Sequence, residues 1–229
     1  MTPAINGVSS MATRQILAVL AEAYRRRAGL DVVITPMGGV DAARAVRAGE
    51  PFDIVVLAAN VMERLEAEGH ILPGSRADLA RSGIAMAVRA GAPRPAIGDE
   101  ESVKRAMLES HAVAYSTGPS GDHLKHLWER WGVADRMSGR ALQAPAGVPV
   151  GALLARGEAD LGFQQLSELI DMPGIDVVGP LPPAIQSVTM FTAGIGAKSL
   201  EAEAARAFIA QLASPEAGAT KRRYGMEAP

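Results

Sequence analysis

The sequence predicts an α/β fold with parallel sheets that are covered by helices on both faces. Three observations lead to this prediction. Short apolar runs rich in β-branched residues alternate with stretches of helical periodicity, as at Ile54–Ala58 and Val61–Glu68. The strand–helix order repeats along the chain, which favours parallel strands joined by crossover helices. The length of 229 residues is also enough for two small cores.

Three strand–helix pairs are expected in the first third of the chain. Apolar residues recur at helical spacing through Ile16 and Leu20, and this first helix ends at Gly29. Gly38 and Gly39 mark the turn that leads into the second helix. The expected pairs are Ala4–Val8 with Ala12–Arg27, Leu30–Thr35 with Val40–Ala48, and Ile54–Ala58 with Val61–Glu68.

The same alternation continues to the end of the chain. The strand at Ile84–Arg89 stops at a turn that begins at Gly91. Ser199 is a candidate N-cap for the closing helix. The other expected strands are Ala112–Ser116, Ala159–Phe163, Asp176–Val178 and Ser187–Ile195. The expected helices are Glu100–Ser110, Asp122–Trp131, Val148–Arg156 and Leu200–Leu212.

This pattern predicts two lobes in one continuous binding unit. The strand near residues 82–88 is expected to carry the chain into the second lobe, and the strand near 186–194 to bring it back. We therefore expect residues 1–82 together with about 186–229 to form one lobe, and residues 83–185 to form the other.

Composition excludes several classes of protein. The formal net charge of -2 gives no basic field for nucleic acid. No apolar run approaches the roughly 20 residues of a membrane span, so we expect no membrane insertion. The absence of cysteine excludes disulfides, thiolate catalysis and Cys-ligated metals. We expect neither a cofactor nor a metal site.

The first ten residues lack the basic start and the apolar run of a secretory signal. As the chain is written, we expect a cytoplasmic protein. A chain from which an export signal had been removed would look the same, and for that case we expect a periplasmic protein.

The loops that follow strands are the candidate binding site, because parallel α/β proteins bind ligands beyond the carboxyl ends of their strands. Ser9 and Ser10 lie in the first of these loops and offer hydroxyls and backbone amides to an anion. Gly38 and Gly39 in the second loop expose backbone N–H groups at a helix start. The alternatives are a plain N-cap for the serines and an ordinary turn for the glycines.

The third loop is the strongest candidate for binding. Ser116, Gly118, Ser120 and Gly121 combine hydroxyls with glycine at the point where a strand leads into a helix, which is typical of an anion-binding loop. The loop has neither the lysine of a P-loop nor the glycine spacing of a dinucleotide site. A carboxylate or a small oxyanion is therefore expected rather than a nucleotide phosphate.

Later residues add candidates of the same kind. Val148 lies at a helix start, Gln164 and Gln165 end a strand, and Gln186 lies near the return crossing. The side-chain amides of these glutamines can donate to a ligand oxygen, or they can form hydrogen bonds within the folded protein. His123 follows the third loop and is the candidate acid–base group, with a solvent-facing histidine as the alternative.

The chain resembles the type II periplasmic-binding proteins, and most of all their molybdate-binding branch, which includes aconitate-isomerase-like proteins. The segments VSSMATRQIL, GGVDAARAVRAGEPFDIVVLAANVMERLEAEGHI, GPSGDHL and GVPVGALLARGEADLGFQQLSELI carry the resemblance over nearly the whole chain. It implies two Rossmann-like lobes around a central cleft and a small anionic ligand. It also implies an ABC-transporter permease as a possible partner if the protein is exported.

The resemblance matches Ser10, Gly39, Ser120, Val148 and Gln165 to the family's ligand-binding positions. It implies a serine in place of Gly39 and a tyrosine in place of Gln165, so two hydroxyls suited to a tetrahedral oxyanion are missing. We therefore expect an organic polycarboxylate rather than molybdate. Two alternatives stay open: a cofactor-free isomerase of an unsaturated polycarboxylate such as aconitate, with His123 as its acid–base group, and an oxyanion-binding protein.

Overall fold

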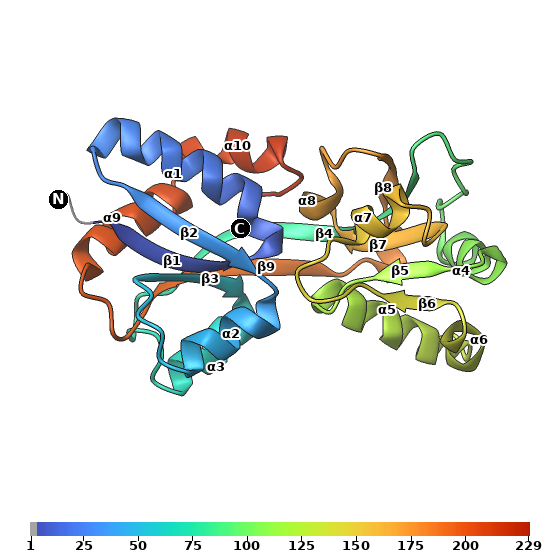
Figure 1. Ribbon diagram of the computed structural model, residues 1–229, viewed down its shortest axis with the longest axis horizontal. Coiled ribbons are helices and arrows are strands. Elements are labelled where there is room, and N and C mark those ends of the chain that lie inside the picture. The colour runs from blue at the N-terminus through green and yellow to red at the C-terminus, as the bar shows by residue number, and fades with distance from the viewer. Residues whose placement is uncertain (1–3) are drawn as a thin grey trace. The chain divides into compact units, whose positions relative to one another are not determined.

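The computed structural model describes residues 4–229, which form two compact units (Figure 1). Unit 1 contains the described residues up to Ser82 together with Thr189–Pro229, and unit 2 contains Gly83–Val188. The chain passes from unit 1 to unit 2 within strand β4 (Ala77–Arg89) and returns at the start of strand β9 (Val188–Ile195). Unit 2 is therefore one continuous segment, whereas unit 1 needs both ends of the chain.

Unit 1 is built on a mixed sheet. Its other strands are β1 (Ile5–Ser10), β2 (Val32–Met37) and β3 (Ile54–Ala58). The strand order is β2-β1-β3-β9, followed by β4. Strand β1 pairs in parallel with β2 and β3, whereas β9 runs antiparallel to β3 with Ile195 opposite Ile54. The carboxyl ends of β1 and β2 therefore lie at the same edge of the sheet.

Helices cover both faces of this sheet. On one side lie α1 (Arg14–Ala28), α9 (Ala202–Ala213) and α10 (Gly218–Arg223), and on the other α2 (Gly39–Arg47) and α3 (Ala59–Ala67) (Figure 1). Strand β3 shows the consequence, because all its residues are buried. Ile54 and Val56 join the apolar cluster of the first side, and Val55 and Leu57 join that of the second, as the strand period of two requires.

Unit 2 contains a second mixed sheet between helices. Its strands are β5 (Val113–Tyr115), β6 (Ala141–Gln143), β7 (Leu161–Gln165) and β8 (Ile175–Pro180), with the second half of β4. Strand β5 is parallel to β6 and β7, and β4 is antiparallel to β7 and β8. The helices are α4 (Glu100–Glu109), α5 (Pro119–Arg130), α6 (Ala134–Ser138), α7 (Val150–Ala155) and α8 (Leu166–Leu169).

Short 3-10 helices connect some of these elements. They are η1 (Met11–Thr13), η2 (Pro183–Ile185) and η3 (Pro215–Ala217).

Within residues 4–229, none of the helices combines the length and the apolar character that a membrane crossing needs.

The α/β prediction is confirmed, and β3 has the predicted bounds. The prediction of parallel pairing is confirmed for β1, β2 and β3. It does not extend to the whole of each sheet, because β9 runs antiparallel to β3 and β4 runs antiparallel to β7 and β8. The spacing of apolar residues shows which side chains are buried, but it does not show whether a strand runs parallel or antiparallel to its neighbour. The prediction of Ser199 as the N-cap is also wrong, because Glu201 is the residue that precedes α9. Ser199 Oγ accepts from the amide of Glu201 at 3.1 Å, ahead of the helix, and donates to Asp53 Oδ1 at 2.6 Å.

Candidate functional site

In unit 1, Ser9 and Ser10 are the last two residues of β1 and not part of a loop, because β1 extends two residues beyond the predicted strand and η1 follows it directly. Ser10 has an extended backbone and caps η1, because its Oγ accepts a hydrogen bond from the amide of Ala12 at 3.3 Å. Its carbonyl accepts a second bond from Thr13 Oγ1 at 3.1 Å. An Oγ that accepts a bond keeps its own proton, so the Ser10 hydroxyl can still donate to a ligand oxygen.

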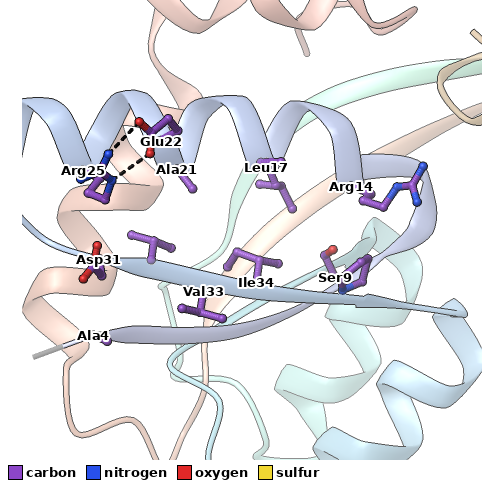
Figure 2. A pocket seen from close by; sticks show the side chains of 13 residues that line it. Ala4, Ser9, Arg14, Leu17, Ala21, Glu22, Arg25, Asp31, Val33 and Ile34 are labelled. Carbon is purple, nitrogen blue, oxygen red and sulfur yellow. Dashed lines mark hydrogen bonds and ion pairs between the residues drawn. The ribbon is translucent and has the colours of Figure 1, made fainter. Parts of the chain in front are cut away.

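Ser9 is placed differently. Its side chain is buried, and its Oγ has no hydrogen-bond partner. Figure 2 shows this oxygen pointing into the space between β1 and α1. Successive residues of a strand point to opposite faces, so Ser9 and Ser10 present their hydroxyls to different surroundings.

The second candidate loop lies beside Ser10. Ser10 is opposite Met37 in the β1–β2 register, which places the loop of Gly38 and Gly39 next to the end of β1. Gly38 precedes α2, and its carbonyl accepts from the amide of Ala42 at 2.8 Å. A Cβ at Gly39 would meet no atom within 4 Å. The start of α2 is therefore open, and a side chain at this position would have room.

In unit 2 the third candidate loop joins β5 to α5. The hydroxyl oxygens of Ser116 and Ser120 lie 2.8 Å apart, and the amide of Gly118 donates to Ser116 Oγ at 3.2 Å. The Ser120 side chain is buried within the first turn of the helix. A Cβ at Gly121 would lie 1.9 Å from the Ser116 carbonyl oxygen, so only glycine fits there. The loop is therefore tightly built, with two hydroxyls at the start of a helix.

His123 lies one turn along α5 and is half-buried. Its Nε2 is 2.8 Å from the carbonyl oxygen of Ile185 in η2. Because a carbonyl oxygen only accepts, Nε2 carries the proton in this contact. In the neutral ring Nδ1 then has a free lone pair, which is the group that a proton-transfer reaction needs.

The two glutamines at the end of β7 are both buried. Gln164 Oε1 accepts from the amide of Val150, the first residue of α7, at 3.0 Å, and Gln164 Nε2 donates to Glu168 Oε2 at 2.6 Å. Gln164 thus fixes the start of α7 from within the fold. Gln165 lies opposite Ile84 in the β4–β7 register.

Val148 lies just before α7 in a tight turn, where its amide donates to the carbonyl of Pro145 at 3.0 Å. Strands β5 and β7 are parallel, with Tyr115 opposite Phe163. The third loop therefore follows β5, and Gln165 is the last residue of the neighbouring strand β7, at one edge of the unit 2 sheet. Val148 precedes α7, the helix whose first amide donates to Gln164.

Gln186 also bonds within unit 2. Its Oε1 accepts from the amides of Ile84 and Ser187 at 2.8 and 2.9 Å, and its Nε2 donates to the carbonyls of Ile84 and Leu181 at 3.0 and 3.3 Å. The side chain therefore acts like a short strand partner for β4. Sequence reasoning did not identify the partners of these side chains. Gln164 lies in strand β7 and Glu168 in helix α8, so their spacing of four residues is not the pairing signal of a single helix.

In the described part of the chain, no cluster of three or more His, Asp or Glu residues could hold a metal ion. The candidate groups of both units are hydroxyls, amides and one imidazole. Such groups donate hydrogen bonds to anionic oxygens and, in the case of the imidazole, exchange a proton with a ligand.

Comparison with known proteins identifies the family. The family model described as bacterial extracellular solute-binding protein matches residues 5–227. The chain belongs to this family. This solute-binding protein is also similar to an aconitate isomerase from Pseudomonas sp. The two sequences are 40% identical over 215 residues, which is 91% of this chain and 81% of that protein.

Solved structures agree on the fold of this solute-binding protein. The periplasmic molybdate-binding protein of Azotobacter vinelandii is 24% identical with a TM-score of 0.82, covering 98% of this chain and 99% of that one. The sulfate-binding protein SubI of Mycobacterium tuberculosis H37Rv is 17% identical with a TM-score of 0.78, covering 99% and 86%. The predicted resemblance to type II periplasmic-binding proteins is therefore confirmed, as is the α/β fold class.

Proposed function

We propose that this solute-binding protein binds a small organic polycarboxylate, with aconitate as the first candidate. The pair of hydroxyls at Ser116 and Ser120 carries this proposal, because hydroxyls and helix-start amides together suit carboxylate oxygens. The relative named an aconitate isomerase supports a tricarboxylate. Gly39 and Gln165 lack the hydroxyls that a tetrahedral oxyanion would use, which favours a carboxylate over molybdate.

Each unit contributes groups to this proposal. Unit 1 offers the Ser10 hydroxyl and the amides at Gly38 and Gly39, and unit 2 offers the third loop. If the units correspond to the two lobes expected from the sequence, removing a hydroxyl from either one weakens binding of the same ligand.

Isothermal titration calorimetry tests the proposal. The protein is titrated separately with trans-aconitate, cis-aconitate, citrate, molybdate and sulfate. We expect at least one tricarboxylate to bind about tenfold more tightly than molybdate, a difference of about 1.4 kcal/mol. Tighter binding of molybdate, or no binding of any carboxylate, would overturn the proposal in favour of an oxyanion-binding protein or another solute.

A second candidate function is isomerisation of aconitate, which the 40% identity to an aconitate isomerase favours. A base removes a proton from the CH2 carbon of aconitate, the double bond shifts by one carbon, and the proton returns to the carbon that was vinylic. The product has the same atoms with the other double-bond geometry. His123 Nδ1 is the group that we assign to this proton transfer, because Nε2 is held by the Ile185 carbonyl.

Proton NMR in D2O separates the binding protein from the enzyme. An isomerase converts trans-aconitate to the cis isomer and introduces deuterium at the carbon that receives the proton. A binding protein leaves both the geometry and the protons of aconitate unchanged. Absence of conversion and exchange under saturating ligand would reject the isomerase and leave the binding proposal intact.

We further propose that, if the protein is exported, its partner is an ABC-transporter permease. The family's description as extracellular supports this. Cell fractionation of the native gene product tests it, because a cytoplasmic location excludes delivery of ligand to a permease from outside.

A further inference from the structure

A pocket lies entirely within unit 1, between α1 and the strands β1 and β2 (Figure 2). Its volume is about 580 Å³, which falls within the range of small-molecule sites. Ser9 lines this pocket, whereas Ser10, Gly38 and Gly39, the groups of unit 1 that the proposed function uses, do not. The pocket is therefore a separate feature that the proposed function does not use.

The sequence explains why this space is open. One stripe of α1, at helical spacing, faces β2, and its middle is occupied by the small side chains of Ala18 and Ala21. Strand β2 lies at the edge of the sheet and contributes Val32 and Ile34, which point to the same face. Small side chains on the helix opposite branched ones on the strand leave an apolar channel between them.

The two ends of the pocket are polar in different ways. Figure 2 shows Ser9 and Arg14 at one end, and Glu22, Arg25 and Asp31 at the other. Glu22 is already paired, because both its oxygens accept bonds from Arg25 at 2.8 Å. In the described residues Arg14 has no carboxylate partner. The first end therefore offers an uncompensated positive charge.

Ser9 gives an independent reason to expect a ligand at that end. Its side chain is 0% exposed, and its Oγ has no hydrogen-bond partner. Buried hydroxyls in folded proteins are nearly always hydrogen-bonded, because an unpaired one loses its bonds to water without replacement. An acceptor oxygen placed in the pocket beside Ser9 would restore this bond.

We propose that this pocket binds a medium-chain aliphatic carboxylate. The carboxylate accepts a hydrogen bond from Ser9 Oγ and pairs with Arg14, while the alkyl chain lies against Leu17, Ala21 and Ile34. The lining from Arg14 to Arg25 extends about 16 Å along α1 at 1.5 Å per residue, which suits an extended chain. The pocket is open to solvent at the exposed side chain of Ala18, so a ligand can enter without unfolding of the helix.

Decanoate is the probe for this site, and calorimetry with the full chain is the measurement. Ala18→Trp places an indole in the channel, and we expect it to weaken decanoate binding at least tenfold. The matched control is Ala23→Trp, an exposed position of the same helix that does not line the pocket, and it should bind decanoate like the wild type. Decanol, which has the chain without the charge, should bind at least tenfold more weakly than decanoate.

Arg14→Gln provides a second test that does not change the size of the channel, and we expect several-fold weaker binding. Equal decanoate affinity in Ala18→Trp and the wild type, or equal affinity for decanol and decanoate, would overturn the proposal. So would loss of decanoate binding in Ser120→Ala, since the ligand would then occupy the unit 2 loop. Unchanged tricarboxylate binding in Ala18→Trp shows that the two sites are separate, and failure of the tricarboxylate proposal leaves this test unaffected.

Discussion

The hydroxyl oxygens of Ser116 and Ser120 lie 2.8 Å apart at the start of α5. Because each hydroxyl has one proton, the pair has one proton left for an external acceptor once the two are bonded to each other. Ser120→Ala removes half of this pair, and we expect the affinity for a bound tricarboxylate to fall about tenfold, as for one hydrogen bond to a charged group. Calorimetry measures the change. The control is Ser138→Ala, an exposed serine of α6, which should leave the affinity unchanged.

The open space at Gly39 leads to a prediction about selectivity. A Cβ there meets no atom within 4 Å, so Gly39→Ser should fold normally and add a hydroxyl at the start of α2. We expect the affinity for molybdate to rise about tenfold relative to the wild type, because the hydroxyl adds a donor for an oxyanion. Gly39→Ala adds the Cβ without the hydroxyl and should show no gain. An equal gain in both variants would contradict the hydrogen-bond explanation.

Gly121 is predicted to be essential for the shape of the third loop. In Gly121→Ala the new Cβ would lie 1.9 Å from the Ser116 carbonyl oxygen, so the loop or the helix must move. We expect the free energy of unfolding to fall by about 2 kcal/mol, within the range for overpacked sites, when it is measured by urea denaturation. Gly139→Ala is the control, since its Cβ would have no neighbour within 4 Å and its φ is -84°. If the free energy of unfolding fell by the same amount in both variants, the clash at Gly121 would have no cost of its own.

His123 is predicted to matter for proton transfer more than for binding. In His123→Gln an amide can still donate to the Ile185 carbonyl, but it cannot accept a proton from carbon. We expect trans-aconitate to bind within about threefold of the wild-type affinity, and deuterium exchange and isomerisation to be lost, since general base catalysis contributes at least about a hundredfold. His126→Gln, at an exposed position on the same helix, should retain the wild-type rate. Exchange at the wild-type rate in His123→Gln would rule out this residue as the base.

Sequence patterns predicted the elements that have a long or strongly apolar signal. Strand β3 was predicted over its full length because both its faces are buried, which leaves a continuous apolar run. The short elements α6, β6 and α8 were missed, since three to five residues are too few to show a period. The direction of β9 was missed as well, because it is set by pairing with β3, which is distant in the chain.

The candidate site was predicted at the level of loops but not of single side chains. The sequence places Gln164 and Gln165 together and cannot say how their amides are used. The structure shows Gln164 bonded to Val150 and Glu168, and Gln186 bonded to the backbone of Ile84. Such partners come from other elements, so they depend on the folded arrangement. That Ser10, Gly39, Ser120, Val148 and Gln165 bind a ligand stays a prediction.

The discontinuity of unit 1 determines the order in which the molecule can be completed during synthesis. Residues 83–188 leave the ribosome as a continuous segment, so unit 2 can fold while the last part of the chain is still being made. Strand β9 lies between β3 and β4 in the sheet of unit 1, yet it is the last strand to be translated. Until it emerges, the nascent chain carries β3 with an unpaired apolar edge, the kind of surface that chaperones protect from aggregation.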